Sequence, residues 1–67
     1  MIEIVLNGET KALPAEQSIA ELCKQIGAPA SGIAVALNYE LIPRAQYEKV
    51  VLRANDKVEI IIATAGG

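Results

Sequence analysis

The sequence contains no histidine, tryptophan or phenylalanine, and it has a single cysteine, Cys23. Without histidine, the chain cannot build a Ser-His-Asp triad, a histidine general base or a Cys/His zinc site. One cysteine cannot form a disulfide within the chain. The only aromatic residues are Tyr39 and Tyr47, so the core must be aliphatic. We therefore expect a protein that is not an enzyme, has no catalytic residues of its own and binds no metal.

Long hydrophobic runs and concentrated positive charge are also missing. The longest apolar run is far shorter than the roughly 20 residues that span a bilayer. The first residues lack the basic and apolar regions of a signal peptide. The six basic residues are dispersed and the net charge is −2, which disfavours binding to a phosphate backbone. We expect a cytoplasmic protein that binds neither membrane nor nucleic acid.

The composition that is present is that of one small globular domain. The chain has 67 residues, of which 52% are hydrophobic and 21% are charged. A chain of this length can bury a single core and has no room for a second domain. We predict a folded domain over residues 1–63, followed by a flexible tail over residues 64–67.

A hairpin is predicted at the beginning of the chain. Apolar residues alternate along residues 2–6 until Asn7-Gly8, a dipeptide that favours a two-residue hairpin turn. The returning residues 9–13 are polar enough for a strand near the edge of a sheet, and Pro14 ends that strand.

A helix is predicted next, from Ile19 to Ile26. Ser18 and Glu21 form the Ser-x-x-Glu pattern of a capping box. The apolar residues that follow recur at helical spacing, and Gly27 can end the helix in a left-handed conformation. Cys23 lies in this apolar stripe, where a thiol could be a nucleophile or a small core residue, and the absence of histidine favours the core.

Residues 33–38 are almost entirely apolar and predict a central strand. Its bulky residues should face the helix, whereas Ala34 and Ala36 should form a smooth outer surface. Residues 38–44 mix turn formers with isolated apolar residues, and we expect them to wander irregularly over the surface.

Two more strands are predicted, over residues 48–52 and residues 57–63. The last strand should place Val58, Ile60 and Ile62 on its inner face and Ile61 on its outer face. If Val5 and Ile61 lie beside the two alanines, they form an apolar patch, and such patches mark partner-binding surfaces. The element order predicts an α+β fold with one helix packed on one face of a mixed sheet of four to five strands.

The tail carries no charge apart from its terminal carboxylate. Gly66 and Gly67 have no Cβ, so the tail could enter a narrow site on a partner. The same residues could equally be an ordinary frayed terminus.

These features together resemble a known family, the ThiS sulfur carriers of thiamin biosynthesis. The resemblance rests on the Asn7-Gly8 turn, residues 33–38, the Ile-Pro-Arg segment ending at Arg44, the Asn55-Asp56 turn and the final Gly66-Gly67. It covers the whole chain and implies a ubiquitin-like β-grasp fold. Ala65 stands where the family commonly has a third glycine.

The resemblance also implies a mechanism in which this chain is a carrier acted on by other proteins. An E1-like adenylyltransferase of the ThiF type would adenylate the carboxylate of Gly67, using ATP that this chain does not itself bind. A sulfur donor enzyme such as a cysteine desulfurase would supply the sulfur of a terminal thiocarboxylate. Thiazole synthase of the ThiG type would then accept that sulfur.

On this interpretation each candidate residue has a role. Gly67 is the site of covalent modification, and Gly66 and Ala65 give the tail clearance. The candidates for partner docking are Val5, Ala34, Ala36, Ile61 and Arg44. Arg44 could instead be an ordinary solvated arginine.

Two alternatives remain open from the sequence. The chain could be another carrier with the same fold and ending, either the small subunit of molybdopterin synthase or a ubiquitin-like protein of transfer-RNA thiolation. It could also belong to a different class, a non-covalent binding module of β-grasp type, in which the tail has no chemical role.

Overall fold

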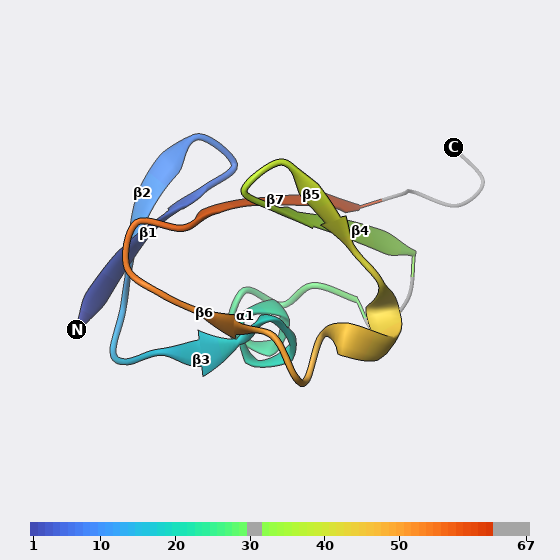
Figure 1. The fold of residues 1–67 in the computed structure, drawn as a ribbon, viewed down its shortest axis with the longest axis horizontal. Helices are drawn as coiled ribbons and strands as arrows, with labels where there is room; N and C mark the ends of the chain where they lie inside the picture. The colour runs from blue at the N-terminus through green and yellow to red at the C-terminus, as the bar shows by residue number, and fades with distance from the viewer. Residues whose placement is uncertain (30–31, 63–67) are drawn as a thin grey trace.

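The fold consists of one helix packed across one face of a mixed sheet. The computed structural model describes residues 1–29 and 32–62. Five strands form the main sheet, in the order β2-β1-β7-β4-β5, and β3 pairs with β6 in a separate two-stranded sheet. Figure 1 shows α1, β3 and β6 together on one side of the main sheet. The elements are β1 (Ile2–Leu6), β2 (Glu9–Leu13), β3 (Gln17–Ser18), α1 (Ile19–Gln25), β4 (Ile33–Leu37), β5 (Glu40–Ile42), the 3-10 helix η1 (Arg44–Gln46), β6 (Val51–Leu52) and β7 (Lys57–Ile62).

The predicted hairpin is confirmed. Asn7 and Gly8 both have positive φ, 50° and 83°, as a two-residue hairpin turn of this kind requires. The strands β1 and β2 pair antiparallel from Leu6 opposite Glu9 to Ile2 opposite Leu13. The strand β2 lies at one edge of the sheet, as expected from its polar sequence.

The predicted helix is confirmed, with its end one residue earlier than expected. The capping box is present: the Glu21 amide donates to Ser18 Oγ at 3.1 Å, and the Ser18 amide donates to Glu21 Oε1 at 3.0 Å. The helix ends at Gln25 with Ile26 as its C-cap, and Gly27 follows at φ 76°. Within the part of the chain that the structure describes, no helix is long and apolar enough to cross a membrane.

The core lies between the helix and the inner face of the sheet. Cys23 is 8% exposed and belongs to this core, which confirms its predicted place. Burial of aliphatic side chains from every layer is the main stabilising contribution in so small a domain. The largest fully buried side chains are Ile4, Leu13, Ile19, Leu22, Val35, Leu52 and Val58.

The last strand, β7, is the middle strand of the sheet. It pairs parallel with β1 and antiparallel with β4. Val58 and Ile60 are buried on its inner face, as predicted. Ile62 was expected on the same buried face but is 51% exposed, because it lies opposite Ile33 at the end of the sheet, where the core ends. A helix over a mixed sheet with the last strand in its middle is the predicted β-grasp arrangement.

Residues 38–44 were expected to wander over the surface rather than form a long regular element. The structure has no long element there, but it has a short strand and the start of a 3-10 helix that were not predicted. Residues 40–42 form β5, which pairs antiparallel with β4 as an edge strand, and η1 begins at Arg44. The connection from β4 is a tight turn in which Asn38 has φ 50° and Tyr39 has φ 70°. A tyrosine rarely adopts positive φ, so the turn formers of this segment did not indicate a tight turn centred on Asn38 and Tyr39.

The predicted strand over residues 48–52 is also shorter and differently placed than expected. Only Val51 and Leu52 are extended, and they pair with β3 outside the main sheet. The backbone carbonyls of Tyr47 and Val50 instead accept hydrogen bonds from the start of the helix. The Ile19 amide donates to the Val50 carbonyl at 3.1 Å, and the Ala20 amide donates to the Tyr47 carbonyl at 2.9 Å. These bonds satisfy backbone donors that the first turn of a helix leaves free.

Candidate functional site

The predicted site of covalent chemistry lies beyond the part of the chain that the structure describes. Gly67, Gly66 and Ala65 belong to residues 63–67, which are outside the described residues, as is the predicted boundary between domain and tail. The structure does show what precedes them. The described chain ends at Ile62, the last residue of the middle strand β7.

The Asn7 side chain holds β7 on its β1 side. Its Oδ1 accepts from the Ile60 amide at 2.8 Å, and its Nδ2 donates to the Ile60 carbonyl at 3.3 Å. The Asn7 amide also donates to the Val58 carbonyl at 2.9 Å. The side chain thereby continues the parallel ladder past Leu6, where β1 turns away. A hydrogen-bonding side chain in the hairpin turn thus fixes the strand that leads into the tail.

On its other side, β7 is paired with β4 along its whole length after Lys57. The register runs from Leu37 opposite Val58 to Ile33 opposite Ile62. The strand is therefore held from both sides through Ile60 and from the β4 side to Ile62. The position of Ile62 relative to the rest of the sheet is therefore fixed.

An apolar surface lies on the sheet face that points away from the helix. We call Ala34, Ala36, Leu41 and Ile61 the outer face. Ala34 is the register partner of Ile61, and Ala36 is that of Leu41. Ile61 is 66% exposed and Leu41 is 70% exposed, and the two alanines between them are half-buried. Three of the four predicted docking residues of the sheet therefore come together beside the end of β7.

The fourth, Val5, lies apart from them. Its register partner on β7 is Lys57, whereas Ala34 lies opposite Ile61. The exposed Glu59 stands between Lys57 and Ile61 on the same face of β7. Charged side chains thus separate Val5 from the outer face, and the continuous patch predicted from the sequence does not form around it.

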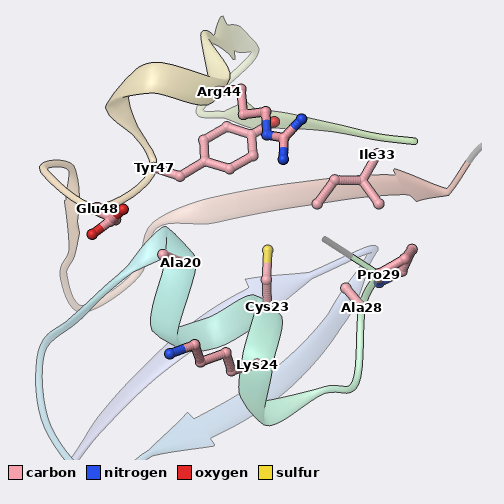
Figure 2. Close-up of a pocket in the computed structure, with 9 residues that line it drawn as sticks. All are labelled: Ala20, Cys23, Lys24, Ala28, Pro29, Ile33, Arg44, Tyr47 and Glu48. Atoms are coloured by element: carbon pink, nitrogen blue, oxygen red, sulfur yellow. The ribbon is translucent and has the colours of Figure 1, made fainter. Parts of the chain in front are cut away.

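Arg44 lies on the other side of the sheet, at a pocket we call the helix-side pocket. Its volume is about 320 Å³, and residues of α1, the start of β4 and the segment from Arg44 to Glu48 line it. Figure 2 shows the Arg44 guanidinium turned over the space between Tyr47 and Ile33, above the sulfur of Cys23. Arg44 therefore cannot belong to one surface with the outer face.

The Cys23 thiol lies at the floor of this pocket and is not activated. Burial raises the pKa of the Cys23 thiol, so the reactive thiolate is disfavoured near neutral pH. Among residues 1–29 and 32–62, no three His, Cys, Asp or Glu side chains gather into a group that could hold a metal ion.

Sequence reasoning missed Leu41 because it assigned no strand there. In the structure, the turn before β5 is fixed by Asn38, whose amide donates to the Lys57 carbonyl at 2.7 Å and whose Oδ1 accepts from the Lys57 amide at 2.9 Å. Lys57 Nζ lies 5.4 Å from the centre of the Tyr39 ring. The asparagine, a residue that tolerates positive φ, was the only signal that could have indicated the turn.

Comparisons with known proteins agree with this fold. The crystal structure of the thiamine biosynthesis protein ThiS from Geobacter metallireducens superposes with a TM-score of 0.85 at 23% identity, covering 98% of this chain and 100% of that one. The solution structure of a thiamine biosynthesis protein from the same organism gives a TM-score of 0.82 at 23% identity, covering 98% of this chain and 88% of that one.

Two curated proteins are similar in sequence. The sulfur carrier protein ThiS of Escherichia coli strain K12 is 27% identical over 66 residues, 98% of this chain and 100% of its own length. Thiazole synthase of Paramagnetospirillum magneticum is 30% identical over 66 residues, which are 98% of this chain. The chain spans only 20% of the length of that thiazole synthase. The model of the ThiS family matches residues 4–67, and the chain therefore belongs to the ThiS family.

Proposed function

We propose that this chain is a sulfur carrier of thiamin biosynthesis and that the carboxylate of Gly67 is its reactive group. The observation that supports the proposal most directly is the place of β7. The middle strand of the sheet is held by Asn7 on one side and by β4 on the other. In the sequence it is followed directly by the residues that end in Gly66-Gly67. Membership of the ThiS family gives the proposal its chemistry.

The proposed chemistry has two stages, both carried out by partner enzymes. An E1-like adenylyltransferase of the ThiF type joins the Gly67 carboxylate to the α-phosphate of ATP and releases pyrophosphate. A sulfur donor enzyme, such as a cysteine desulfurase, then supplies a persulfide, whose terminal sulfur displaces AMP and forms an acyl disulfide. A second thiol attacks the donor's sulfur of this S–S bond, forms a disulfide with the donor and releases the thiocarboxylate. A carboxylate is a poor electrophile, and the adenylate supplies the leaving group that it lacks.

A tail with small residues suits this chemistry. The activating enzyme must hold the carboxylate in line with the α-phosphate, and such close placement requires an unhindered approach. Four residues, Thr64 to Gly67, span roughly 13 Å when extended, enough to enter a site while the body stays outside. Gly66 and Ala65 supply this clearance, and the chain itself contributes no catalytic group.

The proposed acceptor of the sulfur is a thiazole synthase of the ThiG type. The similarity of this chain to one fifth of the Paramagnetospirillum thiazole synthase supports that choice, since it indicates that a ThiS-like unit is joined to a protein of that name. The outer face, with Ile61 and Leu41 exposed beside the end of β7, is the proposed docking surface for these partners.

The test is to incubate the purified chain with a ThiF-type enzyme from the same genome, ATP and a sulfide source. We expect ATP-dependent release of pyrophosphate and an increase of about 16 Da in the intact mass, located on Gly67 by fragmentation. Cys23→Ser serves as a control, because oxidation of a thiol adds a similar mass. Deleting Gly67, or adding one residue after it, should abolish both signals and leave the melting temperature unchanged. Adenylation of either tail variant at the normal rate would contradict the proposal.

A non-covalent β-grasp binding module is the second candidate, and the exposed outer face is the observation that favours it. Such a module would use Ile61 and Leu41 to bind a partner and would not need Gly67. The two functions differ in one measurement. In a strain lacking the gene, a chain without Gly67 restores growth without thiamin only if the module hypothesis is correct.

A further inference from the structure

The helix-side pocket is not used by the chemistry proposed for the tail. Its volume of about 320 Å³ is at the lower end of the range for ligand sites and is large enough for an aliphatic side chain. Its floor is apolar, formed by Ala20, Cys23 and Ile33, with the ring of Tyr47 as one wall.

The wall opposite α1 is rigidly attached to the helix. The Tyr47 carbonyl accepts from the Ala20 amide at 2.9 Å, and the Tyr47 amide donates to the Arg44 carbonyl at 3.1 Å. The two sides of the pocket are thus joined by backbone hydrogen bonds at the residues that line it. These hydrogen bonds hold the walls of the pocket in place, and preorganised sites bind with a smaller entropic penalty.

Charge at the mouth of the pocket is uneven. Figure 2 shows the Arg44 guanidinium over the Ile33 end, whereas the Glu48 carboxylate lies at the opposite end, beyond Ala20. Among residues 1–29 and 32–62, the Arg44 guanidinium takes part in none of the side-chain hydrogen bonds. The Ile33 end therefore favours a negatively charged group on the occupant.

The same end of the pocket adjoins the strand position opposite Ile62, the last described residue of β7. Ile33 forms part of the floor, and its register partner on β7 is Ile62. The outer face meets β7 at Ile61, the neighbouring residue, on the opposite side of the sheet. A protein that encloses the chain immediately after Ile62 can therefore contact the outer face on one side of the sheet and the helix-side pocket on the other.

We propose that the helix-side pocket is a second docking site, which accepts a leucine-sized aliphatic side chain of a partner protein while a carboxylate of that partner pairs with Arg44. This inference rests on the proposed function only in taking the partner to be an enzyme that encloses the tail. It gives Arg44 a role in docking that is separate from that of the outer face. It also predicts that a tail-binding enzyme contacts the carrier on both sides of the sheet.

The first experiment tests the pocket without any enzyme. The probe is 4-methylpentanoate, which carries the leucine isobutyl group and a carboxylate, titrated into the ¹⁵N-labelled chain and followed by NMR. We expect saturable shifts confined to residues around Ala20, Ile33 and Tyr47, with a Kd in the millimolar range. The neutral amide of the probe should bind about two- to fivefold more weakly, the effect expected for one exposed charge pair.

Two variants and a matched control complete this experiment. Ala20→Leu fills the pocket with a strong helix former and should abolish binding without unfolding α1. Arg44→Gln should reduce the affinity for the carboxylate to that of the amide. Arg53→Gln removes an exposed arginine outside the pocket and should change nothing. Scattered shifts, or equal affinity for amide and carboxylate, would overturn the proposal.

The second experiment identifies the occupant. With the ThiF-type and ThiG-type enzymes, Ala20→Leu should raise the KM for the carrier at least tenfold with one of them, whereas Arg53→Gln leaves both unchanged. Unchanged KM values with both enzymes would overturn the proposal. NMR shifts at Ile33 that depend on protein concentration in the absence of the probe would also overturn it, because they would indicate that a second copy of the chain occupies the pocket. If the unmodified chain is not adenylated at all, the proposed function fails, and the probe titration still decides whether the pocket binds this chemistry.

Discussion

The two faces of β7 differ sharply in the exposure of their apolar side chains. On the inner face, Val58 is 1% exposed and Ile60 is 6% exposed, whereas on the outer face Ile61 is 66% exposed. Ile60 and Ile61 are identical side chains on consecutive residues of one strand, and the alternation of a strand sends them to opposite faces. The comparison teaches that the inner face stabilises the fold, while the outer face is free to serve partners.

The largest expected effect is on the inner face. Ile60→Ala should lower the free energy of unfolding by about 2–5 kcal/mol, because it leaves a cavity under the middle strand. Ile61→Ala, the matched control, should change it by less than about 0.5 kcal/mol. Urea denaturation gives both values. If Ile60→Ala does not fold, Ile60→Val should still show a loss of about 0.5–1.5 kcal/mol. Equal losses at the two positions would remove the distinction between the faces.

The next effect concerns the link between the hairpin and β7. Asn7→Gly keeps the positive φ of the turn but removes both side-chain hydrogen bonds to Ile60, and it should cost about 1–3 kcal/mol. Asn7→Ala should cost more, because alanine is strained at φ 50°. In hydrogen exchange, the Ile60 amide should lose more protection in both variants than the Val35 amide on β4. Unchanged protection of Ile60 would show that the Asn7 side chain does not hold the strand.

A smaller effect is expected from pH, through Cys23. Burial raises the pKa of its thiol above the usual value of about 8.5, so the unfolded chain loses this proton first as pH rises. The contribution of this group to stability is therefore complete below about pH 8.5 and is lost as pH rises through the higher folded-state pKa. Under reducing conditions, the stability advantage of the natural chain over Cys23→Ala should shrink between neutral and alkaline pH. Parallel pH profiles would contradict this expectation.

The smallest effect on stability should come from the residue with the largest proposed role in docking. Ile61→Glu places a charge on an exposed side chain and should change the free energy of unfolding by less than about 0.5 kcal/mol. It should weaken binding to the enzymes that are proposed to act on the tail at least tenfold, as measured by calorimetry. A large loss of stability with unchanged binding would assign Ile61 to the core instead of the docking surface.

The local elements of the fold could be predicted because their signals are local. Asn7-Gly8 indicates the first turn, and Ser18 with Glu21 indicates the helix start, since in each case the residues that bond lie within three positions of one another. The buried side of β7 followed from alternation alone. The family resemblance implied the ubiquitin-like β-grasp fold, and the structure confirms it.

The parts that were missed either lack a clear local signal or depend on distant partners. The strand β5 exists because residues 40–42 pair with β4 across a turn that needs positive φ at Tyr39, a residue with little preference for it. The strand predicted over residues 48–52 is shortened because the Val50 carbonyl accepts a hydrogen bond from the Ile19 amide in the first turn of the helix. Distant pairing also divides the docking candidates: register places Ile61 opposite Ala34, and it places Val5 opposite Lys57, four residues away along β7.

The hydrogen bonds between Asn7 and Ile60 join residues 53 positions apart in the chain. Contacts between such distant positions are the slow, late events of folding, whereas hairpins and helices form quickly from near neighbours. The centre of this sheet is therefore assembled only after nearly the whole polypeptide has been synthesised. A product that terminates before Lys57 lacks the strand that joins β1 to β4, so the two halves of the main sheet cannot form one continuous sheet.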